Sequence, residues 1–254
     1  MFEGRPAFVR MTLVAAAGVS CLAAVACGSS TTSSGGAAPG ASSSTTADPL
    51  AGLTAAQVQA KTVADAKASS SLTLKGSLAQ SSQSYTVNLA IKPSQGCTGT
   101  IGEGSKGSFK LIVIGKTIYL NPDDTFWKAN AGANAAAAIA LVNGRYLKVS
   151  ASDSNMASLA DMCDVSQLFS SDDPSGKATK GAVTTLGGTR VLPLKNSDGS
   201  VAYVTDTSKP QLVELAAPKG SSDGTGMVTV TTGAPVTLTP PSASQVIDGS
   251  KLGM

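Results

Sequence analysis

Alternation of apolar and polar residues dominates two stretches of the chain. In the first, the alternation runs through residues 72–78 and 85–91, on either side of a turn at Ser81–Ser84. A period of two over such runs is typical of half-buried antiparallel strands. Further short strands are expected over Cys97–Glu103 and Arg145–Val149. A second series is expected over Gly181–Leu194, Ser200–Thr205, Gln211–Ala217, Gly226–Thr231 and Pro235–Leu238.

Helical spacing precedes the first series and separates it from the second. Thr54 and Gln57 have the spacing of a capping box, which opens a helix. Its apolar face is expected to hold Ala56, Ala60, Val63 and Ala66. Three more helical stretches are expected, one after Asp123-Asp124, one over Ala133–Val142 and one over Ser154–Phe169. This order predicts an α+β fold in which helices pack on or across the concave side of a curved antiparallel sheet.

The segments Ser108–Ile114 and Thr117–Leu120 predict a hairpin, because Gly115-Lys116 suits a two-residue turn. A two-residue loop pairs Ile114 with Thr117 and so fixes the register of the whole hairpin. One face then carries Phe109, Leu111, Val113, Ile118 and Leu120, and the other carries Ile112, Ile114 and Tyr119. An antiparallel sheet with one wet side would be polar on one face. We therefore expect helices to cover one face and further protein or a ligand to cover the other.

The first thirty residues contain a candidate modification site. Arg5 and Arg10 precede an uncharged apolar run, Met11–Ala26, which closes on small residues before Cys27. This arrangement resembles the lipobox of bacterial lipoproteins, in which signal peptidase cleaves before a cysteine that receives a diacylglyceryl group. One departure is Ala24 at position −3, where Leu is usual. Two alternatives remain open: acylation at Cys21, whose position −3 is a poorer fit, and an ordinary secretory signal cut nearby. The run is shorter than the ~20 residues of a membrane span.

The segment after Cys27 is rich in Ser, Thr, Gly and Ala and holds almost no large apolar residue. It cannot bury enough surface to fold. The sequence thus predicts a signal peptide over residues 1–26, an acylated cysteine with a disordered tether over 27–48, and a single domain over 49–254. Two acyl chains would hold that domain stably at the extracytoplasmic face of the cell membrane.

Composition narrows the possible chemistry. The chain has no histidine, so Ser-His-Asp triads, Cys-His pairs and histidine-containing zinc sites are excluded. The formal charge of +3, scattered along the chain, gives no footprint for nucleic acid. No motif calls for a cofactor or a metal ion. We therefore expect a protein that is not an enzyme.

Two glycine motifs match catalytic or binding patterns in letters only. Gly102–Gly107 reads GxGxxG but precedes a strand, whereas a dinucleotide site needs a helix there. Gly220–Gly224 reads GxSxG without a histidine base. Both are interpreted as turns.

With Cys21 removed and Cys27 acylated, Cys97 and Cys163 are the remaining cysteines. An oxidising compartment favours their pairing in a disulfide. A redox or metal role would want a CxxC motif or further ligands, which the sequence lacks.

The domain from about Pro49 to Val246 resembles actinobacterial cell-envelope lipoproteins of the LppX/LprG/LprF type and, more distantly, the LolA-type lipoprotein carriers. The stretches that carry the resemblance are Leu72–Ala79, Tyr85–Ile91, Gly107–Leu120, Phe126-Trp127-Lys128 and the segment from Gly188 to Pro210. The resemblance implies an antiparallel half-barrel whose concave face, closed by helices, holds the acyl chains of lipids or lipoglycans for transport or presentation at the envelope.

The leading hypothesis is therefore a membrane-anchored, lipid-binding lipoprotein. Its candidate cavity-lining residues are Phe109, Leu111, Val113, Ile118, Leu120, Phe126 and Trp127. If the opposite face of the hairpin points into the cavity, the lining residues are Ile112, Ile114 and Tyr119 instead. The alternative hypothesis is a scaffold or accessory sensor that binds an envelope protein. It predicts a filled interior and an exposed apolar patch.

Overall fold

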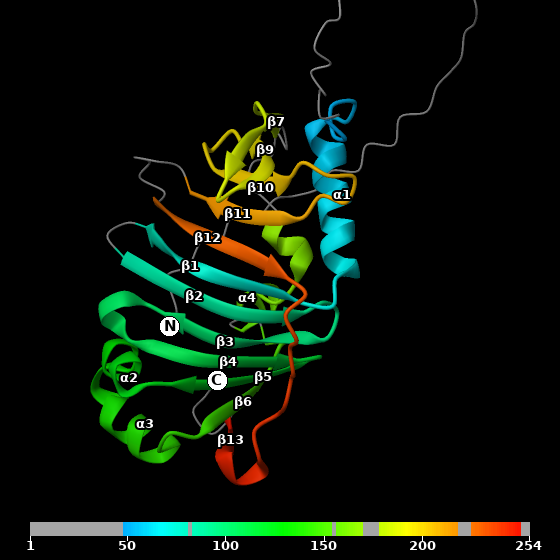
Figure 1. The fold of residues 1–254 in the computed structure, drawn as a ribbon. Coiled ribbons are helices and arrows are strands. Elements are labelled where there is room, and N and C mark those ends of the chain that lie inside the picture. The colour runs from blue at the N-terminus through cyan, green and yellow to red at the C-terminus, as the bar shows by residue number, and fades with distance from the viewer. Residues whose placement is uncertain (1–47, 81–82, 154–155, 170–177, 218–224, 250–254) are drawn as a thin grey trace, which may run out of the picture.

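The computed structural model describes residues 48–80, 83–153, 156–169, 178–217 and 225–249 (Figure 1). The helices are α1 (Ala55–Ala68), α2 (Asp124–Asn130), α3 (Ala135–Val142) and α4 (Ala157–Asp161), with 3-10 turns η1 (Gly104–Lys106), η2 (Gly132–Asn134), η3 (Val165–Phe169) and η4 (Ala243–Gln245). The first strands are β1 (Leu72–Gln80), β2 (Gln83–Lys92), β3 (Gly96–Gly102), β4 (Ser108–Ile114), β5 (Thr117–Pro122) and β6 (Tyr146–Ser150). The later strands are β7 (Thr179–Lys180), β8 (Thr184–Leu186), β9 (Thr189–Lys195), β10 (Val201–Thr205), β11 (Leu212–Ala216), β12 (Thr225–Thr232) and β13 (Val246–Asp248).

All the described strands join one sheet, in the order β13-β6-β5-β4-β3-β2-β1-β12-β11-β10-β9-β7, with β8 paired to β9. Every pairing is antiparallel except that of β13 with β6. The outermost strands, β13 and β7, do not pair with each other, so the sheet is curved but open. The predicted α+β half-barrel is confirmed.

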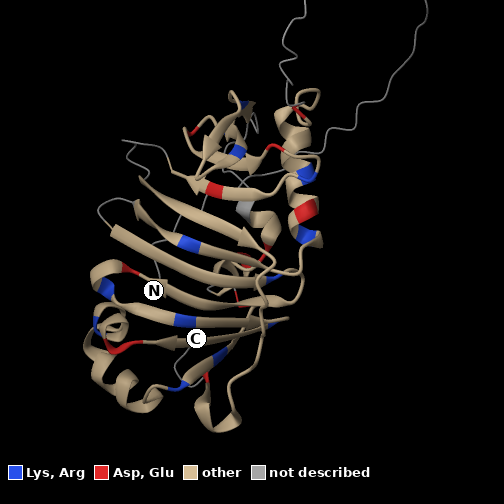
Figure 2. Cartoon of the chain, viewed as in Figure 1, with Lys and Arg blue, Asp and Glu red and all other residues tan. Residues whose placement is uncertain are grey.

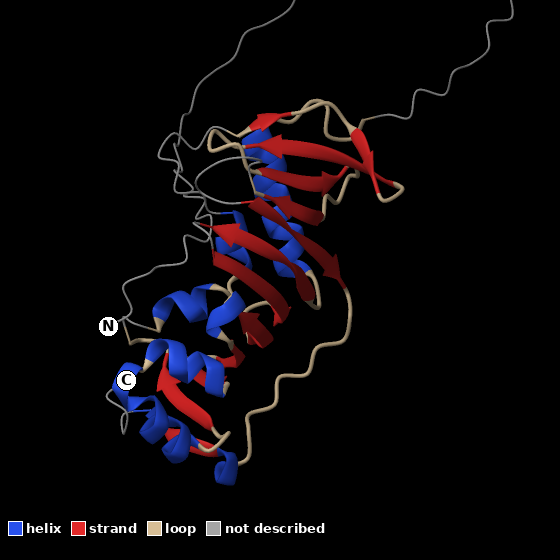
Figure 3. Ribbon diagram, turned by 90° about the vertical axis from the view of Figure 1, so that its left-hand side faces the viewer, coloured by secondary structure: helices blue, strands red, loops and turns tan. Residues whose placement is uncertain are grey.

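The helices lie on one side of the sheet, which Figure 3 shows edge-on. Two glycines in the sheet help it to curve around the helices. A Cβ at Gly76 in β1 would collide with the backbone of Met227, and a Cβ at Gly99 in β3 would collide with the backbone of Asn88. Glycine at such positions lets neighbouring backbones approach closely. We call the side that faces the helices the inner face.

Helix α1 begins with the predicted capping box. Thr54 Oγ1 accepts from Gln57 N at 3.2 Å, and Gln57 Oε1 accepts from Thr54 N at 2.8 Å. The predicted apolar face is wrong in part, because Ala56 and Ala60 are exposed. The buried side is instead formed by Ala55, Val58, Gln59, Thr62 and Ala66. The Thr62 hydroxyl is satisfied within the helix by the Val58 carbonyl, at 2.8 Å, which lets a polar residue stand where spacing alone favours an apolar one.

The third expected helical stretch is shorter than predicted. Helix α4 ends at Asp161, and after Cys163 the chain turns into η3. At the start of η3, the Asp164 carboxylate accepts from Ser166 N at 2.8 Å, a local bond that competes with helix continuation. The stretch over Ala133–Val142 likewise divides into η2 and α3.

Two strand predictions in the C-terminal half are corrected. The segment Gly181–Leu194 is a hairpin of β8 and β9, because Gly187 and Gly188 form its turn with φ of 54° and 82°. Pro235–Leu238 belongs to an extended segment, 233–242, that joins no strand. Proline cannot donate to a sheet, and Pro235, Pro240 and Pro241 occupy this stretch. The segment runs down the side of the sheet away from the helices to reach β13 (Figures 1 and 3).

Within the described ranges, no helix combines the length and the apolar character that a bilayer crossing needs.

Candidate functional site

The inner face of β1–β6 is built from apolar rows that run across the strands. One row joins Leu72, Ile91, Cys97, Val113, Ile118 and Val149. The next joins Leu74, Leu89, Gly99, Leu111, Leu120 and Leu147, and a third joins Gly76, Val87, Ile101, Phe109 and Pro122. Apart from the half-buried Gly76 and Gly99, all these residues are buried. Period-two alternation therefore places one continuous apolar layer beneath the helices.

The predicted register of the β4–β5 hairpin is confirmed: Ile114 pairs with Thr117 and Val113 with Ile118. The candidate lining residues Phe109, Leu111, Val113, Ile118 and Leu120 share the inner face. Leu111 and Ile118 are 0% exposed, and Val113 is 3% exposed. In this structure the protein itself covers these side chains, so they form part of the core.

The remaining candidate lining residues, Phe126 and Trp127, lie on α2. The Phe126 ring meets the Phe109 ring edge to face, with centroids 5.5 Å apart, and Trp127 stands 6.3 Å from Phe126. Asp123 fixes the start of α2, because its carboxylate accepts from Phe126 N at 2.7 Å and from Ser108 N at 2.8 Å. Burial favours a higher pKa for Asp123, but hydrogen bonds from Phe126, Ser108 and Thr125 together hold its pKa below the ordinary 3.8. Helix α2 is thus tied to the strand that it covers.

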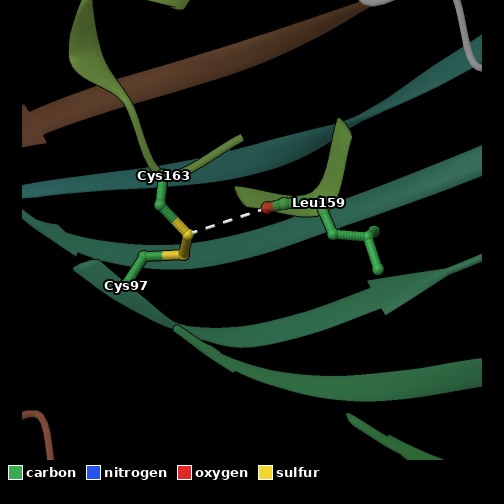
Figure 4. Close-up of a disulfide and its surroundings, with 3 residues drawn as sticks. All are labelled: Cys97, Leu159 and Cys163. Atoms are coloured by element: carbon green, nitrogen blue, oxygen red, sulfur yellow. Dashed lines mark hydrogen bonds between the residues drawn. A yellow bond between two sulfur atoms is a disulfide. The ribbon is translucent and has the colours of Figure 1, made fainter. Parts of the chain in front are cut away.

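A disulfide joins the helix layer to the inner face, as the sequence predicted. Cys163 follows α4, Cys97 lies on β3, and their Cα atoms are 5.3 Å apart. Figure 4 shows the bridge between α4 and the strands below it. Because Cys97 pairs with Val113 and Ile91, the disulfide meets the sheet next to the candidate lining residue Val113. It keeps α4 against that part of the inner face.

One end of the inner face is less covered and more polar. Beyond the third row, the inner positions are Leu78 on β1, Tyr85 on β2 and Glu103 after β3, and all three are half-buried. Burial raises the pKa of Glu103, and Lys106 acts in the opposite direction. Burial and the nearby Glu103 carboxylate raise the pKa of Tyr85. We call Leu78, Tyr85 and Glu103 the rim; sequence patterning extended to Tyr85 but did not single out Glu103.

The outer face of the same strands carries Ile112, Ile114 and Tyr119, which are half-buried. The alternative prediction, in which this face of the hairpin points toward the helices, is therefore wrong. The expectation that both faces are covered holds for the inner face, whereas the outer face is covered only in part. Val236 and Leu238 of the extended segment that runs on this side are also half-buried.

The turn where the predicted tether would join the domain is held by one lysine. Lys180 on β7 donates from Nζ to the carbonyl oxygens of Leu50, Ala51 and Leu53, at 2.7, 3.1 and 3.0 Å. Leu50 itself is fully buried. Residues 48–54 are therefore part of the folded domain. Cys27 and most of the predicted tether lie outside the described residues, as does the motif Gly220–Gly224.

Charge is sparse across the sheet, and Figure 2 shows charged positions scattered singly along the strands. Among the described residues, no group of three or more Asp, Glu, Cys or His side chains is arranged to hold a metal ion. The chemistry of the inner face is therefore that of apolar contact, with polar groups at the rim.

No protein-family model matches this chain, and no curated protein sequence does. The fold resembles several solved structures at low identity. LprF from Mycobacterium bovis is 15% identical, with a TM-score of 0.46, over 74% of this chain and 97% of that one. The lipoprotein LppX from Mycobacterium tuberculosis is 10% identical, with a TM-score of 0.43, over 72% and 98%. An uncharacterised conserved protein from Thermus thermophilus is 9% identical, with a TM-score of 0.40, over 76% and 98%. At such low identities and TM-scores, the likeness is one of overall backbone fold alone.

Proposed function

We propose that the protein is a membrane-anchored extracytoplasmic lipoprotein that binds the acyl chains of a lipid or lipoglycan between its helices and the inner face, for transport or presentation at the cell envelope. The observation that carries the proposal is the continuous apolar layer of three rows under a thin, discontinuous set of helices. Acyl chains need apolar surface and little else, at about 25 cal/mol per Å² buried. The Cys27 lipobox would keep the domain beside its source of lipid.

The closed packing sets a condition on this function. Because the helices bury the inner face, an acyl chain can enter only where a helix moves away from the sheet. The disulfide at Cys163 restrains α4, whereas α2 is attached by its Asp123 cap and by aromatic contacts. We therefore place entry at the rim, beside α2, where Leu78 and Tyr85 are already partly exposed.

The single tryptophan of the chain offers a direct test. Trp127 is half-buried on α2 and packs against the core. A monomeric short-chain lipid brominated on its acyl chain is titrated into the protein, and Trp127 fluorescence is recorded. Binding under α2 quenches the emission in a saturable manner, because bromine quenches only at close contact.

A matched control moves the reporter to the other face. In the double variant Trp127→Phe/Tyr119→Trp, the tryptophan lies on the outer face of β5. Lipid bound at the inner face leaves this variant unquenched. Equal quenching of both proteins would show adsorption to the surface, and no quenching of either would show that acyl chains do not enter; both results contradict the proposal.

A second function has one observation in its favour. Helix α3 contains only Ala, Ile, Leu and Val, yet Leu141 is 43% exposed and Ala136, Ala137 and Ala140 are exposed too. A filled interior together with an exposed apolar patch is what the scaffold hypothesis predicts. On that hypothesis, the wild-type protein does not bind lipid but binds an envelope protein. The substitution Leu141→Ser then removes the binding to that protein.

A further inference from the structure

The rim of the inner face brings together side chains of opposite charge. Glu103 and Tyr85 flank the last β2–β3 register pair, Thr86 with Gly102, and strand alternation turns both toward the inner face. Cross-strand neighbours at such positions have Cβ atoms about 5 Å apart. A carboxylate and a phenol therefore follow the last register pair on neighbouring chain segments, where the apolar rows end.

Lys106 adds a cation to the same end. It lies in η1, in the turn that Glu103 begins, where Lys106 N donates to the Glu103 carbonyl at 3.0 Å. The Lys106 side chain reaches across to β2, where Nζ donates to Gln83 Oε1 at 2.9 Å. Gln83 follows the same alternation as Tyr85, so this bond holds the ammonium group over the inner side of the rim.

The turn that carries both charges is rigidly seated. Gly104 lies against the start of β2, since a Cβ there would stand 3.1 Å from the Ser84 carbonyl oxygen. On its other side, a Cβ at Gly107 would collide with the backbone of Phe126 and with the Asp123 carboxylate. The turn is thus wedged between β2 and α2, and Glu103 and Lys106 keep fixed places relative to the apolar rows.

We propose that Tyr85, Glu103 and Lys106 form a recognition site for a zwitterionic lipid headgroup, in which Glu103 and the Tyr85 ring bind an ammonium group and Lys106 binds the adjoining phosphate. This inference rests on the proposed lipid binding, since the acyl chains of such a lipid would occupy the inner face behind the rim. Ionised partners of opposite sign give the stronger class of hydrogen bonds. An aromatic ring face adds attraction for an ammonium group.

The chemistry predicts a definite selectivity. A phosphatidylethanolamine offers both the ammonium group and the phosphate, whereas a phosphatidylglycerol of the same chain length offers the phosphate and no ammonium group for Glu103. We expect the wild-type chain to bind the first about tenfold more tightly, which is the lower range for charge-assisted bonds at a half-exposed site.

The test measures binding of monomeric dihexanoyl phosphatidylethanolamine, phosphatidylglycerol and diacylglycerol by calorimetry. Glu103→Gln is expected to remove the preference for phosphatidylethanolamine while the diacylglycerol affinity stays unchanged. Lys106→Met is expected to weaken both phospholipids and leave diacylglycerol unaffected. The matched controls are Glu214→Gln, a half-buried glutamate on the outer face of β11, and Lys116→Met, an exposed lysine in the β4–β5 turn.

The outcomes separate the two proposals. If all three lipids bind equally and Glu103→Gln changes nothing, the headgroup site is overturned and lipid binding stands. If none of the three binds, lipid binding itself fails and the headgroup site falls with it. Phosphoethanolamine without chains serves as a competitor: binding as tight as that of the whole lipid would identify a site for free phosphoamines and overturn the lipid assignment.

Discussion

Cys97 lies opposite Val113 in the β3–β4 register, so the disulfide to Cys163 reaches the sheet beside one of the most completely buried candidate lining residues. The contact fixes α4 over the row that also contains Ile118. It follows that the two ends of the inner face are held differently: a covalent bridge fixes the helix layer at the disulfide end, whereas α2 beside the rim is held by hydrogen bonds and aromatic contacts.

The disulfide is expected to contribute strongly to stability. Cross-linking residues 66 apart removes loop entropy from the unfolded chain and stabilises by roughly 4 kcal/mol in the chain-entropy model. Denaturant unfolding of the wild type with and without reductant measures this term. The double variant Cys97→Ala/Cys163→Ala should be less stable and insensitive to reductant. A wild type whose midpoint does not move on reduction would contradict the account.

Val113 is expected to behave as a core residue. Val113→Ala leaves a small cavity beside the disulfide and should cost about 2 kcal/mol. Val113→Asp should prevent folding, because it buries a carboxylate with no partner. Its loss of lipid binding would therefore not identify a cavity wall. Ile112→Ala, on the outer face of the same strand, is the control and should cost clearly less by denaturant unfolding.

The Asp123 cap is expected to stabilise the attachment of α2. Asp123→Ala removes the bonds to Phe126 N and Ser108 N and should cost about 1–2 kcal/mol, at the upper end for a helix cap. The neighbouring Asp124→Ala is the control, since the capping side chain of α2 is that of Asp123. Because the folded-state pKa of Asp123 is lowered, its contribution is present at neutral pH and disappears as the pH falls below the ordinary 3.8. If Asp123→Ala and Asp124→Ala have equal free energies of unfolding, Asp123 does not stabilise the attachment of α2.

Lys180 is expected to hold the turn before α1. In Lys180→Met the carbonyl groups of Leu50, Ala51 and Leu53 lose a charged donor. Amide hydrogen exchange over residues 48–58 should then accelerate, with β1–β6 unchanged. Lys195→Met, an exposed lysine on neighbouring β9, should leave the exchange of that turn as in the wild type. Acceleration throughout the sheet would indicate global destabilisation instead.

Binding of a phosphatidylethanolamine is expected to depend on pH through Glu103. The ammonium group needs the ionised carboxylate, so affinity is highest above the Glu103 pKa and is lost as the pH falls through it. Because burial raises this pKa above the ordinary 4.5, the loss begins at a higher pH than for an exposed glutamate. The other charged and titratable groups around this turn are Tyr85 from β2, Lys106 from the turn itself and Asp123, which precedes α2. Tyr85 should stay neutral and Asp123 ionised between pH 5 and 8, because the Tyr85 pKa is raised and the Asp123 pKa is lowered. Calorimetry across this range should show a flat profile for Glu103→Gln; a variant that still follows the wild-type curve would exclude Glu103 as the titrating group.

Sequence patterning predicted the hairpin around Gly115, because a two-residue turn leaves one register, and the apolar positions then sort onto two faces. It also predicted the Cys97–Cys163 bridge, because few cysteines remained. It did not predict that Gln59 and Thr62 are buried in α1, since such burial depends on neighbours supplied by the tertiary structure. Glu103 was missed for the same reason: its position at the end of the apolar rows becomes visible only when β2 and β3 are paired. The identity of the acylated cysteine stays a prediction from the sequence.

The most direct test of lipid binding is native mass spectrometry of the full chain carrying Cys21→Ser and Cys27→Ser, exported from a bacterium with a lipoprotein-bearing envelope, so that no covalent anchor at either candidate cysteine contributes mass. The account predicts a mass above that of the disulfide-bonded polypeptide, and organic extraction should release the excess as an acyl lipid. A bare polypeptide mass, still bare after incubation with envelope lipids, would contradict lipid binding and favour the protein-binding scaffold.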